Sequence, residues 1–169
     1  MDIAAWNPYA VALLLFVTVQ RLAELVLAQR NTQRLLARGA FEVAPEHYKL
    51  IVLLHAAWLI GLWLLAPARE PNPFLFVVYA LLQVARLWVL ATLGERWTTR
   101  IIVLPGAPLV SSGPYRFVSH PNYCVVVAEI LILPLVFNLP VFALVFTLLN
   151  AAVLTIRIRA ENGALQRAQ

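Results

Sequence analysis

The chain has 169 residues, of which 62% are hydrophobic and 12% charged, and its mean hydropathy is +0.81. Soluble domains carry about 45–50% apolar and about 25% charged residues, so the composition excludes a water-soluble globule and predicts an integral membrane protein. The formal net charge is +5. Because the basic residues lie between apolar blocks, they indicate a membrane and no nucleic-acid partner. The one cysteine, Cys124, excludes an internal disulfide and a zinc site built on several thiolates.

Five apolar segments are candidates for membrane helices, each of which needs about 20 mostly apolar residues. We expect them at residues 8–28, 50–66, 74–93, 122–137 and 140–157. The first lacks the basic flank and cleavage site of a signal peptide, so we expect a retained helix. The last two come from one apolar stretch that is interrupted at residues 138–140, and because both are short, a re-entrant hairpin is the alternative. The sequence therefore predicts one all-α membrane domain over residues 1–169, a bundle of five transmembrane helices.

The distribution of basic residues predicts the orientation, since Lys and Arg near helix ends stay on the cytoplasmic side. With the N-terminus outside, Arg69 falls in an outer turn. The inner segments then hold Arg30, Arg34, Arg38, Lys49, Arg96, Arg100, Arg116, Arg157, Arg159 and Arg167. We expect a multi-pass membrane protein with a cytoplasmic C-terminus and its chemistry on the cytoplasmic face.

The inner segment from Gly94 to Pro121 contains several prolines and glycines and is also apolar, which predicts a folded loop. It ends in His120 and Pro121, and a proline in the first helical turn leaves the N–H groups that follow it free to bind an anionic group. The alternative is that His120 only caps the helix. His120 and Cys124 are too few ligands for a metal site, so we expect none. No Rossmann or P-loop motif for a nucleotide is present.

Charged residues inside apolar segments are costly and usually face a bundle interior. Arg21 and Glu24 stand three apart in the first segment, as do Gln83 and Arg86 in the third. Each pair either lies near the inner headgroups, where long side chains extend their charged ends or pair, or lines a polar pocket that opens to the inner face. Glu129 lies deeper, in the fourth segment, and its carboxylate needs a partner. Arg86 or Arg21 is the expected partner.

Four more polar residues carry expectations of their own. His55 lies in the middle of the second segment and is expected to hydrogen-bond a neighbouring helix rather than bind a ligand. Asn150 is expected to form an interhelical hydrogen bond. Arg157 and Glu161 stand four apart on one helical face, which by itself indicates a basic anchor with a surface ion pair.

Two motifs in the C-terminal part of the chain resemble the isoprenylcysteine carboxyl methyltransferase family. They are Gly113-Pro114-Tyr115-Arg116-Phe117-Val118-Ser119-His120-Pro121-Asn122-Tyr123 and Arg157-Ile158-Arg159-Ala160-Glu161-Asn162-Gly163-Ala164-Leu165. Ser119 stands where the family usually has an arginine, and Asn162 where it has a second glutamate. The segment from Gln20 to Asn31 is similar to a short bacterial branch whose enzymes O-methylate long-chain alkylpyrones or alkylresorcinols. This similarity implies a protein of the bacterial cytoplasmic membrane.

The resemblance implies a methyltransferase that uses S-adenosylmethionine, with Arg157 as a catalytic residue on the substrate side and Glu161 closing the cofactor site. The cofactor-binding residues that it implies are Ala107, Pro108, Leu109, Val110, Tyr115, His120, Pro121, Asn122, Tyr123 and Glu161. We expect Arg21, Glu24 and Arg86 to line the approach of the substrate, together with Arg157.

The substrate is expected to be a lipophilic small molecule that presents a hydroxyl or a carboxylate for O-methylation. Membrane lipids are the expected partners, with no obligate protein partner. The alternatives are an NADPH-dependent membrane reductase of the sterol type, whose family shares a similar His-Pro loop, a phospholipid N-methyltransferase, and a membrane scaffold without catalysis.

Overall fold

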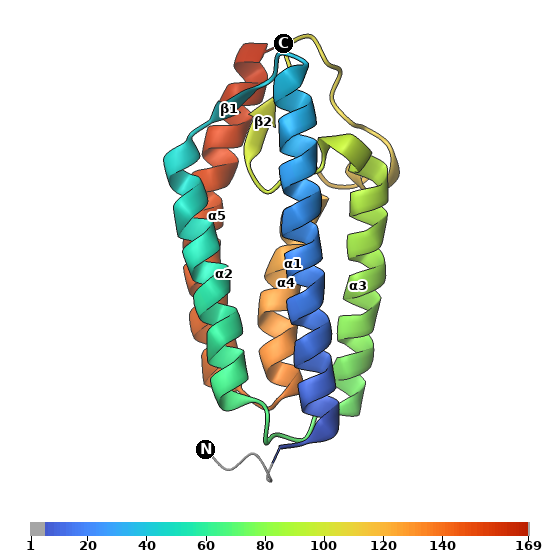
Figure 1. The fold of residues 1–169 in the computed structure, drawn as a ribbon, viewed down its shortest axis with the longest axis vertical. Helices are drawn as coiled ribbons and strands as arrows, with labels where there is room; N and C mark the ends of the chain where they lie inside the picture. The colour runs from blue at the N-terminus through green and yellow to red at the C-terminus, as the bar shows by residue number, and fades with distance from the viewer. Residues whose placement is uncertain (1–5, 169) are drawn as a thin grey trace.

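The structure is a computed structural model that describes residues 6–168, and five helices form its bundle (Figure 1). They are α1 Pro8–Ala37, α2 Pro45–Leu65, α3 Pro73–Leu93, α4 Pro121–Val136 and α5 Pro140–Ala168. Each begins with a proline, whose fixed φ suits the first helical position and whose missing N–H costs nothing there. Asn7 and Asn72 cap α1 and α3 through side-chain oxygens that accept from Tyr9 N and Leu75 N, at 2.9 and 3.1 Å. The expected all-α bundle is confirmed.

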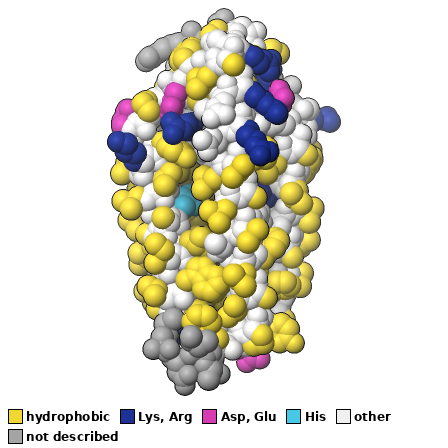
Figure 2. All heavy atoms as spheres, viewed as in Figure 1, with side chains coloured by type: hydrophobic (Ala, Val, Ile, Leu, Met, Phe, Trp, Pro, Cys, Tyr) yellow, Lys and Arg dark blue, Asp and Glu magenta, His cyan; other side chains and the backbone are white. Residues whose placement is uncertain are grey.

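Four helices, α1, α2, α3 and α5, are long and apolar enough to cross a membrane. With 16 residues, α4 extends for about 24 Å, less than the roughly 30 Å of a bilayer core. It packs against α3 and α5, α2 also packs against α5, and α1 crosses in front of α4 (Figure 1). Lys and Arg side chains gather toward the upper end of the molecule, above a broad hydrophobic surface (Figure 2). These features agree with a multi-pass membrane protein.

The hydrophobic core lies near the lower end of the bundle, where side chains of α1, α2, α3 and α4 are buried and Phe142 and Phe146 of α5 pack against them. The buried side chains include Leu14, Trp58, Leu62, Tyr79, Leu133 and Phe137. Gly61 lets α2 and α5 approach closely, since a Cβ at this position would lie 2.6 Å from the Phe142 ring. Close packing of this kind, rather than water exclusion, holds helices together inside a bilayer.

Two helices run beyond their expected ends. α1 continues past residue 28 to Ala37, and α5 continues past residue 157 to Ala168. In both cases the hydropathy drops but good helix formers such as Gln, Arg, Leu and Ala follow. α1 stops only before Gly39, which has a φ of +88°. Arg30 and Arg34 therefore lie on α1 and not in a loop, and Glu161 lies on α5.

A small antiparallel sheet that the sequence analysis did not predict joins two loops at the upper end. Strand β1 Phe41–Val43 pairs with β2 Ile101–Val103, in the register Phe41 to Val103. Arg100 reinforces the pairing through an ion pair of 2.8 Å with Glu42. We call this part of the molecule, residues 38–44 and 94–120, the loop end. It also contains the short helices η2 Gly94–Arg96 and η3 Gly113–Arg116.

Cysteine labelling tests the predicted orientation of the protein in the membrane, with the loop end on the cytoplasmic side. Cys124 is replaced by serine, and a single cysteine is placed at Ser112, in the loop end, or at Glu70, at the opposite end of the bundle. A membrane-impermeant maleimide should label the Glu70→Cys variant in intact cells, and the Ser112→Cys variant only after the membrane is opened. Labelling of Ser112→Cys alone in intact cells would reverse the predicted orientation.

Candidate active site

At the loop end, the first turn of α4 meets the upper part of α5. The His120 ring stacks on Tyr123, with 5.3 Å between ring centroids, and its Nε2 donates to Asn162 Oδ1 at 3.1 Å. The Tyr123 hydroxyl donates to the Glu161 carboxylate and accepts from Arg157 Nε at 2.9 Å. Arg157 and Glu161 are thus linked through Tyr123, and among the described residues they form no direct ion pair. The expected surface ion pair is wrong because the tyrosine hydroxyl stands between the two groups.

Two further residues of the predicted site lie close to this group. Tyr115 comes from η3, where burial, reinforced by the Glu161 carboxylate, raises its pKa to about 12. Its hydroxyl therefore stays neutral near pH 7. Asn122 Oδ1 accepts from Trp97 Nε1 at 3.5 Å. Gly113 places η3 against α3: it has a φ of +56°, and a Cβ there would lie 2.5 Å from Thr92 Oγ1.

The segment from Ala107 to Val110 is positioned differently. Arg96 Nη1 donates to Pro108 O at 2.5 Å, and Leu109 is exposed. Within residues 6–168, no hydrogen bond or ion pair joins this segment to Tyr115 or to the residues of α4 and α5 described above. The structure thus brings together Tyr115, His120, Pro121, Asn122, Tyr123 and Glu161, and it gives Ala107–Val110 no bond to them within the described residues.

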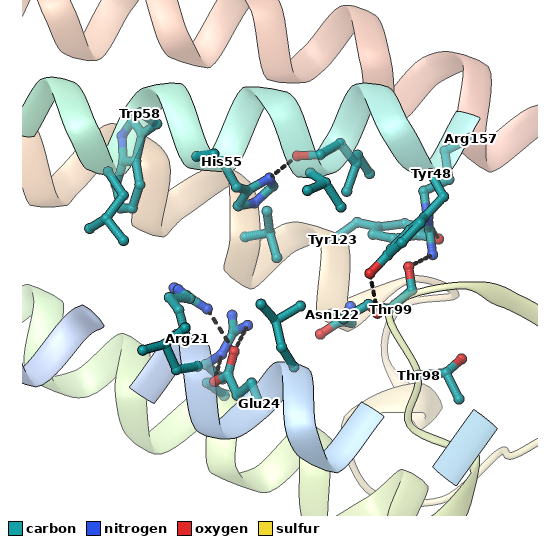
Figure 3. A pocket seen from close by; sticks show the side chains of 18 of the residues that line it. Arg21, Glu24, Tyr48, His55, Trp58, Thr98, Thr99, Asn122, Tyr123 and Arg157 are labelled. Carbon is teal, nitrogen blue, oxygen red and sulfur yellow. Dashed lines mark hydrogen bonds and ion pairs between the residues drawn. The ribbon is translucent and has the colours of Figure 1, made fainter. Parts of the chain in front are cut away.

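A cavity of about 300 Å³ runs from this site down between the helices (Figure 3). Its upper end is lined by Tyr48, Thr99, Asn122, Tyr123 and Arg157. Its lower end, which we call the deep end, is lined by Arg21, Glu24, His55, Trp58 and Arg86. Arg157 is only 5% exposed, and its Nη2 donates to Thr99 O at 2.7 Å, which holds the guanidinium at the upper end. Arg157 therefore belongs both to the Tyr123 group and to the cavity wall.

The same cavity reaches the apolar surface of the bundle between α1 and α2. Leu22 and Leu25 of α1 and Val52 of α2 line it and are also 58%, 43% and 41% exposed. These side chains lie in segments apolar enough to span a membrane. The cavity is therefore bordered by apolar side chains that are also exposed on the surface of the bundle.

A cluster of paired charges forms one wall of the deep end. Arg86 makes a two-fold contact with Glu24, at 2.5 and 2.6 Å, and also pairs with Glu129 at 2.6 Å. Arg21 pairs with Glu129 at 2.8 Å and with Glu24 at 3.0 Å. Gln83 adds a hydrogen bond of 2.9 Å to Glu129. We call Arg21, Glu24, Arg86 and Glu129 the charge cluster.

Both predicted partners of Glu129 are confirmed, since Arg21 and Arg86 each pair with it. Extension of Arg86 to the headgroups is excluded because its side chain is 6% exposed and bonded on all sides. The charged groups pair with one another, and Arg21, Glu24 and Arg86 also line the cavity.

Two other expectations were wrong. His55 Nδ1 donates to Ile51 O at 2.9 Å, a carbonyl of its own helix one turn earlier, and not to a neighbouring helix. Asn150 is fully buried, yet neither of its amide atoms has a partner among the described residues. Sequence reasoning also missed Tyr48, Trp58 and Thr99. A signal existed for Tyr48, which stands seven residues before His55 and so lies on the same face of α2.

Comparison with known proteins gives matches over most of the chain. A sequence model described as "Isoprenylcysteine carboxyl methyltransferase (ICMT) family" matches residues 74–167. The uncharacterized protein YpbQ of Bacillus subtilis is 38% identical over 91% of this chain and 95% of its own length. An uncharacterized protein of Haemophilus influenzae is 25% identical over 86% of this chain and 88% of its own length. No solved structure matches the chain. The chain belongs to the isoprenylcysteine carboxyl methyltransferase family.

Proposed function

We propose that the protein is a membrane methyltransferase that transfers a methyl group from S-adenosylmethionine to an oxygen of a lipophilic acceptor at the cytoplasmic face. Family membership implies a membrane methyltransferase, and members of the family use S-adenosylmethionine. The observation that carries the proposal is the cavity, which opens toward the bilayer between α1 and α2 and ends at Arg157 and Tyr123. An amphiphilic acceptor suits such a cavity.

The residues around Tyr123 fit the chemical groups of S-adenosylmethionine. The Glu161 carboxylate suits an ammonium or a ribose hydroxyl, and the rings of His120 and Tyr123 offer aromatic surface to a cation. No side chain caps the first turn of α4, where the N–H groups of Tyr123 and Cys124 donate to His120 O and the N–H of Asn122 is the one left to meet a carboxylate among the described residues. We propose that Tyr115, His120, Pro121, Asn122, Tyr123 and Glu161 hold the cofactor, with Ala107–Val110 covering it. When bound, the cofactor supplies an electrophilic methyl group on sulfur.

Arg157 is the residue that we propose acts on the acceptor. Its Nε and Nη2 are held by Tyr123 and Thr99, which leaves Nη1 without a partner among the described residues. A guanidinium stays charged and offers planar donors to an oxygen, so Arg157 orients the acceptor oxygen and favours its anionic form. Once the hydroxyl proton has passed to water at the loop end, that oxygen would take the methyl group that the bound cofactor supplies. Orientation of this kind can supply much of the rate.

Between the two acceptor classes we propose a hydroxyl, as in long-chain alkylresorcinols or alkylpyrones, over a prenylated cysteine carboxylate. The ground is the resemblance of residues 20–31 to the short bacterial branch. Purified protein is incubated with labelled S-adenosylmethionine and four acceptors: an alkylresorcinol, an alkylpyrone, N-acetyl farnesylcysteine and phosphatidylethanolamine. We expect label in the first two. Label in the farnesylcysteine alone would overturn the hydroxyl assignment, and label in the phospholipid amine alone would refute O-methylation. NADPH oxidation without methyl transfer would favour a reductase.

Arg157→Ala tests which side of the site this residue serves. Because Arg157 lines the cavity and reaches the cofactor group only through Tyr123, we expect turnover to fall strongly while the dissociation constant of S-adenosylmethionine changes little. Arg159→Ala is the matched control, since Arg159 is exposed on the same helix. Calorimetry measures cofactor binding, and transfer of label measures turnover. If Arg157→Ala instead loses cofactor binding but keeps its turnover per bound cofactor, Arg157 serves the cofactor and not the acceptor.

A further inference from the structure

Arg157 is held in part by a loop, the segment of residues 97–100 between η2 and β2. Its Nη2 donates to the backbone carbonyl of Thr99 at 2.7 Å, and Thr98 and Thr99 both line the cavity (Figure 3). A loop carbonyl is less firmly placed than one inside a helix, because loops are more mobile than the elements that they connect. The groups that fix Thr99 therefore also determine where the Arg157 guanidinium lies.

Arg100 ties this segment to two other elements of the fold. Its Cζ lies 4.5 Å from the centroid of the Tyr48 ring on α2. Its Nη1 donates to both oxygens of the Glu42 carboxylate on β1, at 3.0 and 2.8 Å. Tyr48 also contacts the segment directly, since Thr99 Oγ1 donates to its hydroxyl at 3.4 Å. A cation over an aromatic ring and a charge-assisted hydrogen bond are both favourable, so α2 and β1 together hold the residue next to Thr99.

The beginning of the segment is fixed without Arg100. Trp97 is 3% exposed, and its carbonyl accepts from Asn31 Nδ2 of α1 at 2.8 Å. The Arg100 side chain is 40% exposed, so its ion pair with Glu42 contributes little to the stability of the fold. Removal of the Arg100 side chain should therefore loosen the segment after Trp97 and leave the helix bundle intact.

We propose that Arg100 is a positioning residue that acts on Arg157 through the Thr99 carbonyl. Its contacts with Glu42 and Tyr48 hold that carbonyl in place, and the carbonyl keeps the Arg157 guanidinium at the upper end of the cavity. Arg100 is not among the described residues that line the cavity, so it acts through Thr99 and not on the acceptor. The small sheet then serves the reaction, because β1 supplies Glu42 and β2 begins directly after Arg100. This inference rests on the proposed function, since it takes Arg157 as the residue that acts on the acceptor.

NMR of isotope-labelled arginine side chains tests the proposal without any ligand. A guanidinium whose Nη group is held by a carbonyl rotates slowly about its Cζ–Nε bond and gives separate Nη signals, whereas a free guanidinium gives averaged ones. Arg157→Lys assigns the signals of Arg157, because they disappear in that variant. We expect slow rotation in the unmodified protein and rotation about tenfold faster in Arg100→Ala, since the hydrogen bond that resists rotation is weakened.

Three further variants separate positioning from a general effect on the fold. Arg100→Lys keeps a cation for Glu42 and for the Tyr48 ring, so it should restore most of the slow rotation of Arg157. Glu42→Gln keeps the length of the side chain and removes its charge, and it should speed the rotation less than Arg100→Ala does. Arg38→Ala is the matched control at an exposed arginine of the loop end, and it should leave the rotation unchanged. Unchanged rotation of Arg157 in both Arg100→Ala and Glu42→Gln would overturn the proposal.

Turnover separates this inference from the proposed function. With labelled S-adenosylmethionine and 5-pentadecylresorcinol, we expect Arg100→Ala to lower kcat by about tenfold and to leave the dissociation constant of the cofactor unchanged. In protein that already carries Arg157→Ala, the same substitution should cause no further loss, because Arg100 acts through Arg157. A further loss there would overturn the proposal. Faster rotation in Arg100→Ala without methylation of any acceptor refutes the proposed O-methylation alone, whereas methylation with equal kcat and equal rotation in Arg100→Ala refutes this inference alone.

Discussion

Glu129→Ala is expected to lower the free energy of unfolding by about 3–5 kcal/mol, because it leaves buried charges without their partner. Glu129 is 1% exposed and accepts from Arg21, Arg86 and Gln83. Removing the carboxylate leaves two arginines sharing the single charge of Glu24. Unfolding of the detergent-purified protein by heat or by dodecyl sulfate measures the loss.

Two variants show whether the effect is electrostatic. Glu129→Gln keeps the shape and an acceptor for Gln83 and should destabilise less than alanine. Glu95→Ala removes a carboxylate whose contacts with Arg34 and Arg38 lie at the exposed loop end, at 3.3 and 3.5 Å. Exposed pairs contribute about 0–1 kcal/mol. Equal losses in Glu95→Ala and Glu129→Ala would contradict the importance that we give to the buried charges.

Glu161→Ala is expected to raise the dissociation constant of S-adenosylmethionine by about ten- to a hundredfold, since a hydrogen bond to a charged group contributes about 1.5–3 kcal/mol. The fold should persist, because Glu161 lies near the end of α5, outside the tightly packed core. Calorimetry measures binding, and a melting curve checks the fold.

Asn162→Glu is the matched control for this prediction. A longer carboxylate at this position can still accept from His120 Nε2, as Asn162 Oδ1 does. We therefore expect folding and cofactor binding close to those of the unmodified protein. An unchanged dissociation constant in Glu161→Ala would remove Glu161 from the site.

Hydropathy predicted the five helices, because an apolar run of sufficient length has few alternatives to a membrane helix. The cost of an isolated intramembrane carboxylate likewise predicted the partners of Glu129. The hydropathy of a helix depends on one segment, and the need for a partner depends on one buried charge. A single sequence is therefore enough to predict both features.

Other features depend on which segments meet, which a single sequence does not state. Strands β1 and β2 have three residues each, too few for a periodic pattern. They pair although α2 and α3 lie between them in the chain. Thr99 reaches Arg157 through its backbone carbonyl, a contact that no side-chain pattern predicts. Trp58 resembled any aromatic residue of an apolar helix until the cavity beside it was seen.

For the proposed lipophilic acceptor, a lateral opening at Leu22, Leu25 and Val52 would determine which concentration the protein responds to. A lipid that enters there has already partitioned into the bilayer, and each methylene of its tail favours that step by about 0.8 kcal/mol. The relevant quantity is therefore the mole fraction of acceptor among the surrounding lipids rather than its amount per volume of buffer. Added lipid would dilute the proposed acceptor within the membrane plane even when its bulk concentration is constant, and the methylated product would return to the same membrane pool.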